Sequence, residues 1–244
     1  MSGQLRSELL KLRTTRTMLG LMAGMLSLVA FIVIVQIASD SAAMLADEDR
    51  QRSILLAGGA ASLFAVLVGA MAVTTEFRHG TIRPTLLYQP ARQIVIGAKL
   101  AASVLAGAAL GVLAEVLALG IALPWLAGKG VDRALGGGEL ALAVAGVVAA
   151  SALWAGIGVG IGALVRNQVA AIVGTIVWIL VPEPLLSGLV PDVGRFTPGS
   201  AGQALSGATG ESLLHPLAGG LVLTGYVLVL GAAGALLTDR RDVS

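Results

Sequence analysis

Apolar residues gather in six long stretches that are separated by shorter polar segments. The stretches lie at about 18–38, 54–74, 100–123, 140–165, 168–190 and 217–238. A helix of about 20 apolar residues crosses the ~30 Å hydrocarbon core of a bilayer. Pro182 and Pro184 interrupt the fifth stretch. The pattern predicts an all-α polytopic membrane protein, with six transmembrane helices in a single domain over residues 1–244.

Composition agrees with a membrane protein and excludes an ordinary soluble domain. The mean hydropathy is +0.90 and charged residues make up 12% of the chain, against roughly 25% in soluble domains. The chain contains no cysteine, which excludes disulfides, thiol catalysis and cysteine-bound metals. The pI near 9.4 indicates basic loops that face anionic membrane lipid, and we expect no nucleic-acid partner.

Basic residues predict the orientation. Most of the sixteen Lys and Arg residues lie in the N-terminal arm, the connection after the second span, the turn after the fourth and the C-terminal tail. The positive-inside rule then places both termini in the cytoplasm, at the plasma (inner) membrane. A cleaved signal peptide is the alternative for the N-terminal segment. The apolar stretch from Leu19 to Ala38 exceeds the ~7–15 residues of a signal peptide, so we expect a retained first span.

Two segments outside the spans predict further helices. In residues 3–16, Leu5, Leu9 and Leu12 share one helical face, as expected of an interfacial helix lying on the membrane; the alternative is a basic flank that anchors the first span. Residues 182–215 are rich in proline and carry apolar patches. We expect short outer helices there that dip back toward the bilayer, because irregular backbone is tolerated in a membrane only where protein or water covers it.

Motifs for enzymatic chemistry are lacking. The two histidines, His79 and His215, form no metal-binding pattern, and the sequence has no G-x-S-x-G or G-x-x-x-x-G-K-[ST]. We therefore expect no catalytic residues, no bound metal and no ATP site on this chain. The glycines at 156, 158, 160 and 162 form two overlapping G-x-x-x-G pairs, like Gly20/Gly24 and Gly107/Gly111. Such pairs favour close helix packing.

One acid, Glu115, falls within an apolar stretch. A charge at this depth costs at least about 2.5 kcal/mol, so the side chain is expected to face the bundle or a water-filled path. Two interpretations stay open. Glu115 interacts with a proton, a cation or substrate, or it is a structural acid that hydrogen-bonds a neighbouring helix.

The connection 75–99 combines charge with an apolar side at Leu86, Leu87 and Tyr88, and Gly80 and Pro84 punctuate it. A short amphipathic helix of this kind at the cytoplasmic face is typical of a partner-docking surface. The alternative is a basic loop that only sets the topology.

Two segments resemble the membrane subunits of type-2, exporter-class ABC transporters. The stretch Ser7-Glu8-Leu9-Leu10-Lys11-Leu12-Arg13-Thr14-Thr15-Arg16 is similar to the interfacial helix that opens many members. The stretch Glu76-Phe77-Arg78-His79-Gly80-Thr81-Ile82-Arg83-Pro84-Thr85-Leu86 is similar to the beginning of their coupling helix. Lys99 before the third span and Arg195-Phe196-Thr197-Pro198 before the last span also fit the family pattern.

The resemblance implies a permease subunit that moves a small amphiphile, lipid or antibiotic. It implies two partners, a cytoplasmic ABC ATPase carrying ATP and Mg²⁺ and a second permease subunit, in contact with membrane lipid and with no cofactor on this chain. The path would run along Val66–Thr74 and Ile172–Leu180, with a gate at Leu185, Leu186 and Leu189. The coupling residues would be Glu76, Phe77, Arg78, His79, Gly80, Thr81, Arg83, Pro84, Leu86 and Leu87.

Two other functions remain open on the sequence. A stand-alone secondary carrier would have no ATPase partner and would depend on Glu115. A non-transporting membrane scaffold or immunity protein would protect against a toxic amphiphile without net flux.

Overall fold

The protein is a bundle of long apolar helices. The computed structural model describes residues 2–81 and 92–240 and contains no strand within them. Six stretches are long and apolar enough to cross a membrane: Arg16–Ser39, Ala57–Arg78, Ile94–Gly128, Gly137–Val165, Gln168–Leu189 and Pro216–Leu237. The six predicted spans are therefore confirmed, and the chain is a multi-pass helical membrane protein.

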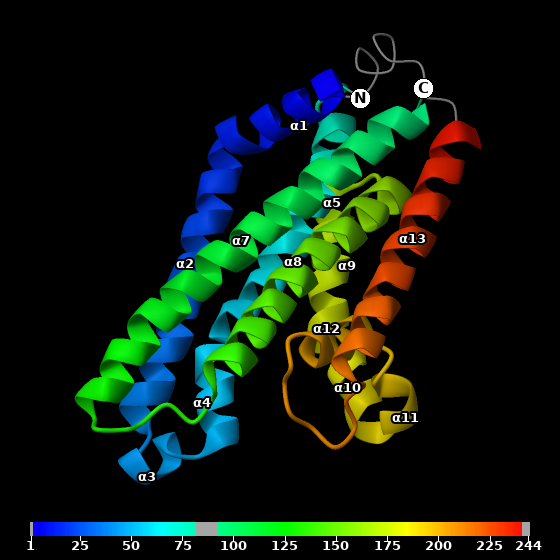
Figure 1. Cartoon of the computed structure of the whole chain (residues 1–244). Helices are drawn as coiled ribbons and strands as arrows, with labels where there is room; N and C mark the ends of the chain where they lie inside the picture. Colours follow the sequence, from blue (N-terminus) through cyan, green and yellow to red (C-terminus); the bar gives the residue numbers. More distant parts are fainter. Residues whose placement is uncertain (1, 82–91, 241–244) are drawn as a thin grey trace.

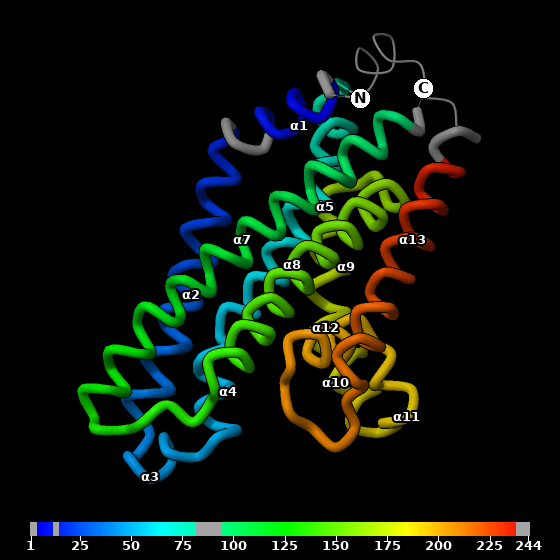
Figure 2. Tube along the Cα trace, viewed as in Figure 1, coloured from blue at the N-terminus to red at the C-terminus, as the bar shows by residue number. Residues whose placement is uncertain are grey.

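The long helices run alternately up and down (Figures 1 and 2). They are α2 (Arg16–Ser39), α5 (Ala61–Arg78), α7 (Arg92–Gly128), α8 (Gly137–Val165), α9 (Gln168–Leu180) and α13 (Pro216–Arg240). The shorter ones are α1 (Ser2–Thr14), α3 (Ala42–Leu45), α4 (Glu48–Leu55), the 3-10 turn η1 (Ala57–Ala60), α10 (Pro182–Leu189), α11 (Pro191–Gly194) and α12 (Pro198–Leu205).

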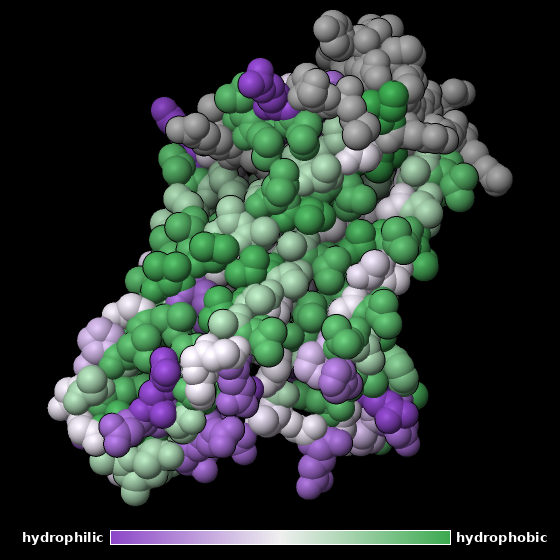
Figure 3. Space-filling view, in the orientation of Figure 1, coloured by the Kyte–Doolittle hydropathy of each residue, from purple (hydrophilic) through white to green (hydrophobic). Residues whose placement is uncertain are grey.

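The bundle has two distinct ends. Helix α1 crosses one end, close to both chain termini, and we call this end the termini face (Figure 1). Helices α3, α4, α10, α11 and α12 gather at the other end, the opposite face. In the view of Figure 3, apolar side chains cover the middle of the bundle and hydrophilic ones collect at the opposite face. This division is what a bilayer-spanning bundle requires, because only the ends meet water.

Several span boundaries differ from the prediction, among them the start of α7 at Arg92 and the end of α9 at Leu180. The third span was expected to stop before Pro124, but α7 continues through it to Gly128. Pro124 cannot donate to the carbonyl four residues earlier, yet Ala122 and Leu126 on either side are buried, and this packing holds the helix together. The second span was expected to end near Thr74, but α5 continues to Arg78. Glycine at 80, with φ of +67°, follows the end of the helix.

Helix α8 is the centre of the bundle and uses its glycines on two sides. A Cβ on Gly158 would lie 2.1 Å from the carbonyl oxygen of Val66, and one on Gly162 would lie 2.6 Å from that of Ala70, both on α5. Gly156 and Gly160 instead face Val227 and Leu230 of α13. The two overlapping glycine pairs thus each pack one neighbouring helix, which confirms their prediction as packing motifs.

The other two glycine pairs differ from each other. Gly107 and Gly111 of α7 pack against α8, where a Cβ on Gly107 would lie 2.5 Å from the carbonyl oxygen of Ser151. A Cβ on Gly20 would have no atom of a neighbouring element within 4 Å, and one on Gly24 would make only an ordinary contact with Phe64. The expectation that Gly20/Gly24 packs closely is therefore wrong within the chain, because this face of α2 points outward.

The alternation of the helices predicts which positions share a side of the membrane. Because the chain has no cysteine, His79→Cys and Gly137→Cys each introduce a single thiol, one after α5 and one at the start of α8. We expect an impermeant maleimide to label only one of the two variants in intact cells, and both variants in broken membranes. Labelling of both in intact cells would contradict the arrangement.

Candidate functional site

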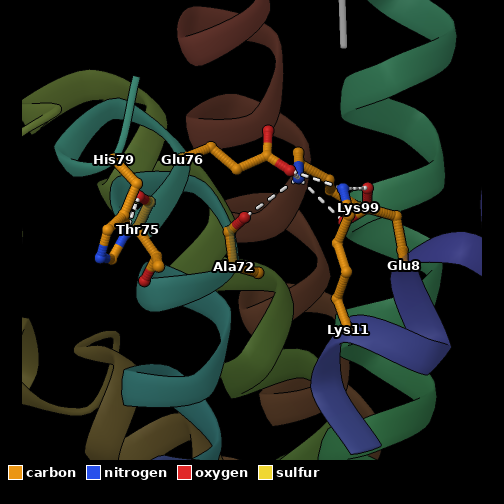
Figure 4. A network of polar contacts seen from close by, with 7 residues as sticks. All are labelled: Glu8, Lys11, Ala72, Thr75, Glu76, His79 and Lys99. Carbon is orange, nitrogen blue, oxygen red and sulfur yellow. Dashed lines mark hydrogen bonds and ion pairs between the residues drawn. The ribbon is translucent and has the colours of Figure 1, made fainter. Parts of the chain in front are cut away.

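Four charged side chains form a compact network at the termini face (Figure 4). Nζ of Lys99 lies 2.8 Å from Oε2 of Glu8 and 2.7 Å from Oε1 of Glu76. Nζ of Lys11 lies 2.8 Å from Oε1 of each of the same two acids. The two lysines balance the two glutamates, so this four-charge network is neutral as a whole.

Three helices contribute to the four-charge network. Glu8 and Lys11 lie on α1, Glu76 lies near the end of α5, and Lys99 lies near the start of α7. The side chains of Lys99 and Glu8 are 2% and 4% exposed. Lys99 also donates to the carbonyl oxygen of Ala72 at 3.1 Å, so each of its three N–H groups has an acceptor within reach. Because buried charges are tolerated only when paired, this network fixes α1 to the ends of α5 and α7.

Lys11 keeps its charge across the neutral pH range. Burial opposes the charge of Lys11, but its hydrogen bonds to Glu76 and Glu8 and their negative charges outweigh burial, so its pKa is raised from 10.5. A raised pKa in the folded state means that the stabilising contribution is present below the ordinary pKa and is lost only as pH rises through the folded-state value. We therefore expect Lys11 to stay bound from acidic to mildly alkaline pH.

Among the residues predicted to dock an ATPase, those that the structure describes divide into three groups. The side chain of Glu76 points into the four-charge network rather than into solvent. The Phe77 ring lies 5.0 Å from the guanidinium of Arg166, and Arg78 donates to Oε1 of Gln168 at 3.1 Å. His79, Gly80 and Thr81 are exposed after α5. The predictions on Arg83, Pro84, Leu86 and Leu87 concern positions outside the described residues.

These contacts connect the end of α5 to the rest of the termini face. Arg166 is the C-cap of α8 and adopts a left-handed conformation with φ of 55°. Its guanidinium donates to the carbonyl oxygen of Leu237 on α13 at 3.1 Å. Gln168 begins α9. Phe77 and Arg78 therefore contact the turn between the fourth and fifth long helices.

A cavity of about 530 Å³ opens near the opposite face. Its walls come from α2, α4, η1, α5, α8, α9 and α12 and the segment after α12, and are mostly apolar, with Ile32, Leu63, Trp154 and Ile179 among them. Polar residues at the cavity are Gln36, Asp49, Arg52, Ser53, Ser62, Gln203, Ser206 and Thr209. Sites for small organic molecules typically have volumes of about 300–1,000 Å³ with a few polar groups, so the cavity is large enough for such a ligand.

Arg52 ties the elements around this cavity together. It donates to the carbonyl oxygen of Gly207 at 3.1 Å and to Glu139 of α8 at 2.7 Å. The cavity wall is therefore a set of segments held together by side-chain contacts, and its shape depends on how those segments pack.

The residues predicted as a gate or as a path lie in different surroundings. Leu185 and Leu189 of α10 are exposed and Leu186 is half-buried. Ile172–Leu180 forms most of α9 and exposes several apolar side chains. Most of Val66–Thr74 is buried inside the chain against α8. Ile172–Leu180 therefore presents more side-chain surface to its surroundings than Val66–Thr74 does.

Glu115 is 1% exposed and faces the interior, as predicted. It lies against η1: a Cβ on Gly58 would be 2.1 Å from Oε2 of Glu115. The backbone of Gly58 in η1 lies within hydrogen-bonding reach of the Glu115 carboxyl group, which has no other hydrogen-bond partner among the described residues. Both sequence interpretations of Glu115 therefore stay open.

Sequence reasoning missed four buried acidic and basic groups. Glu8, Glu76 and Lys99 were assigned to membrane-flanking or docking segments, because charged residues near span ends usually reach water. A signal was present for Glu8, which falls on the same helical face as Leu5 and Leu9. Glu183 is also buried, and it accepts a hydrogen bond from the backbone N–H of Gly199 in the first turn of α12.

Comparisons with known proteins leave the family open. No protein-family model matches the chain, and a search of curated proteins found no match.

Proposed function

We propose that this chain is the membrane-spanning permease subunit of an ATP-driven exporter of the ABC class. In this proposal the termini face is cytoplasmic, in agreement with its excess of Lys and Arg. A separate ATPase docks on the connection after α5, and a second permease subunit, identical or a paralogue, completes the transporter in the plasma membrane. Helix α1 would lie at the membrane interface and the connection would carry the coupling helix.

The four-charge network is the observation that carries the proposal. It binds α1, the last turns of α5 and the first turns of α7 through ion pairs of 2.7–2.8 Å. The connection after α5 leads directly from Glu76 to Lys99, so both of its ends are anchored in the same network. A force applied to the connection would consequently act on a rigid group of three helices instead of on a loose loop.

Contacts beyond the network would carry such a movement further. Phe77 and Arg78 reach Arg166 and Gln168, and Arg166 reaches α13. Displacement of the end of α5 would therefore alter the turn between α8 and α9. Two packed arrangements of these helices, biased by ATP binding to the partner, are the type of two-state element that transport needs.

The cavity near the opposite face supports a small amphiphilic substrate. Apolar walls at Leu63, Trp154 and Ile179 suit a hydrophobic body, while Asp49 and Arg52 suit a polar or charged group. Lipids and antibiotics share this combination.

Affinity purification tests the proposal directly. We would tag the chain, extract it from its native membranes in mild detergent after light cross-linking, and identify the co-eluting proteins by mass spectrometry. The proposal expects a P-loop ATPase in equal amount, and the same experiment reports whether a second permease subunit is present. Recovery of the folded chain without any ATPase would reject it.

A single substitution locates the docking surface. We expect Arg78→Ala to weaken ATPase co-purification about tenfold, since an interface arginine is commonly worth more than 1 kcal/mol. Arg133→Ala, an exposed arginine in the loop between α7 and α8, is the matched control and should leave co-purification unchanged. Equal recovery in both variants would place docking elsewhere.

Glu115 favours a second candidate, a stand-alone secondary carrier driven by protons. Glu115 is a buried acid in the third span, and acids inside transmembrane segments are recurrent elements of proton relays. This candidate expects transport without any ATPase and complete loss of transport in Glu115→Gln with normal expression, whereas the exporter proposal expects a modest change.

A further inference from the structure

Glu115 is isolated from other charges. The buried cluster beside it consists of apolar residues, among them Val33, Ala57, Ala114 and Ala118. Most charged groups of the elements that pack against α7 have partners elsewhere. These groups include Asp40 after α2, paired with Arg50; Lys129, which donates to carbonyl oxygens at the end of α2; Asp49 and Arg52 on α4, lining the cavity; Glu139 on α8, paired with Arg52; Arg78 on α5, bonded to Gln168; and Glu8, Lys11, Glu76 and Lys99, forming the four-charge network.

An acid in such surroundings retains its proton. An ionised carboxylate without a counter-charge in an apolar interior is far costlier than the neutral acid. Apart from the backbone of Gly58, Glu115 has no partner among the described residues. The closed arrangement is therefore compatible with the protonated side chain, and loss of the proton would require water or a counter-ion to enter.

A thin wall separates Glu115 from the cavity. The backbone of Gly58 contacts Glu115, whereas Ala57, Gly59 and Ala60 of the same turn line the cavity. The wall is the short 3-10 turn η1 between α4 and α5. Such turns inside a long helical segment often mark hinges, and Gly59 has open space where a side chain would be.

We propose that Glu115 is a proton-binding site covered by η1, and that η1 opens toward the cavity when the proton leaves. In the closed state Glu115 is the neutral acid and the cavity ends at η1. In the open state the proton passes to water that has entered from the cavity, and that water solvates the carboxylate. The proton is thus exchanged with the compartment at the opposite face. This inference does not depend on how transport is powered.

Single cysteine substitutions test whether η1 opens when Glu115 loses its proton, because the chain contains no cysteine of its own. Ala118→Cys places a thiol one turn from Glu115 at a position that is 0% exposed. Ala208→Cys lies on the cavity wall outside η1 and is the accessible reference, which also corrects for the pH dependence of thiol reactivity. Ala102→Cys, 1% exposed on the same helix near the other end, is the buried control.

We expect maleimide labelling of Ala118→Cys, relative to Ala208→Cys, to rise about tenfold or more between about pH 6 and about pH 9, because each pH unit changes the acid–carboxylate ratio tenfold. In a Glu115→Gln background, labelling of Ala118→Cys should stay low at every pH. Ala102→Cys should not be labelled at any pH. A flat profile with Glu115 present, or the same rise with Glu115→Gln, would overturn the proposal.

Hydrogen exchange on the unmodified chain gives a second test that needs no variant. After correction for intrinsic exchange rates, protection of the amides in residues 56–61 should fall as pH rises, while protection of residues 154–160 in α8 should stay constant. Constant protection in both segments would also overturn the proposal. Neither measurement involves an ATPase or a substrate, so their outcome is independent of the proposed export function.

Discussion

Replacing Lys99 with methionine should lower the free energy of unfolding by about 3–5 kcal/mol, because removing one partner leaves buried charges uncompensated. Lys99 is the least exposed member of the four-charge network, and both Glu8 and Glu76 lie within 2.8 Å of its Nζ atom. Methionine has a similar length and keeps the apolar packing of the side chain. Thermal unfolding of the purified chain in detergent would measure the loss.

Two variants separate charge from packing. Lys11→Met removes a lysine whose side chain is 46% exposed, and a solvated ion pair is worth at most about 1 kcal/mol. Adding Glu76→Gln to Lys99→Met restores the charge balance and should recover part of the lost stability. Equal stability of the Lys99→Met and Lys11→Met proteins would show that the network contributes little.

Replacing Gly158 with alanine should disrupt the contact between α5 and α8. The added Cβ would lie 2.1 Å from the carbonyl oxygen of Val66, whereas even close C–H···O contacts are about 3.3 Å long. The obstacle is backbone, so no side-chain rotation relieves it and the helices must separate. We expect a loss of about 3 kcal/mol, at the upper end of the range for overpacked cores.

The matched control is Gly225→Ala on α13. Gly225 also lies in a long apolar helix, but no atom is within 4 Å of the added Cβ. Alanine favours a helix by about 1 kcal/mol over glycine, so this variant should be as stable as the parent protein or slightly more stable. Similar melting temperatures for Gly158→Ala and Gly225→Ala would contradict the close packing. The reciprocal variant Gly69→Ala should behave like Gly158→Ala, since its Cβ would lie 1.9 Å from the carbonyl oxygen of Ala155.

The fold was largely predictable because a membrane imposes a simple rule on the sequence. Hydropathy located all six spans, and the glycine spacing of α8 predicted close packing. The glycine spacing did not indicate which helices α8 would pack against, since spacing alone carries no information about the neighbouring helix. The start of α7 was missed because Lys99 counts as polar in any hydropathy sum, and only its burial between Glu8 and Glu76 makes this segment part of the bundle.

The cavity could not have been predicted. Its walls come from residues as distant as Ile32 and Thr209, and its volume results from how several helices fit together. Glu115 was recognisable as unusual from the sequence. Its isolation from other charges and its position behind η1 depend on the three-dimensional arrangement and became visible only there.

The four-charge network also sets an order of events during synthesis. Glu8 and Lys11 leave the ribosome before the first span, Glu76 follows at the end of the second, and Lys99 arrives with the third. Until Lys99 has been made, Glu8 and Glu76 together have only Lys11 as a partner, and α1 has no α7 to bind. The N-terminal helix can therefore complete its docking only after the third span has begun, so completed docking reports that the first three spans have been inserted in the correct topology.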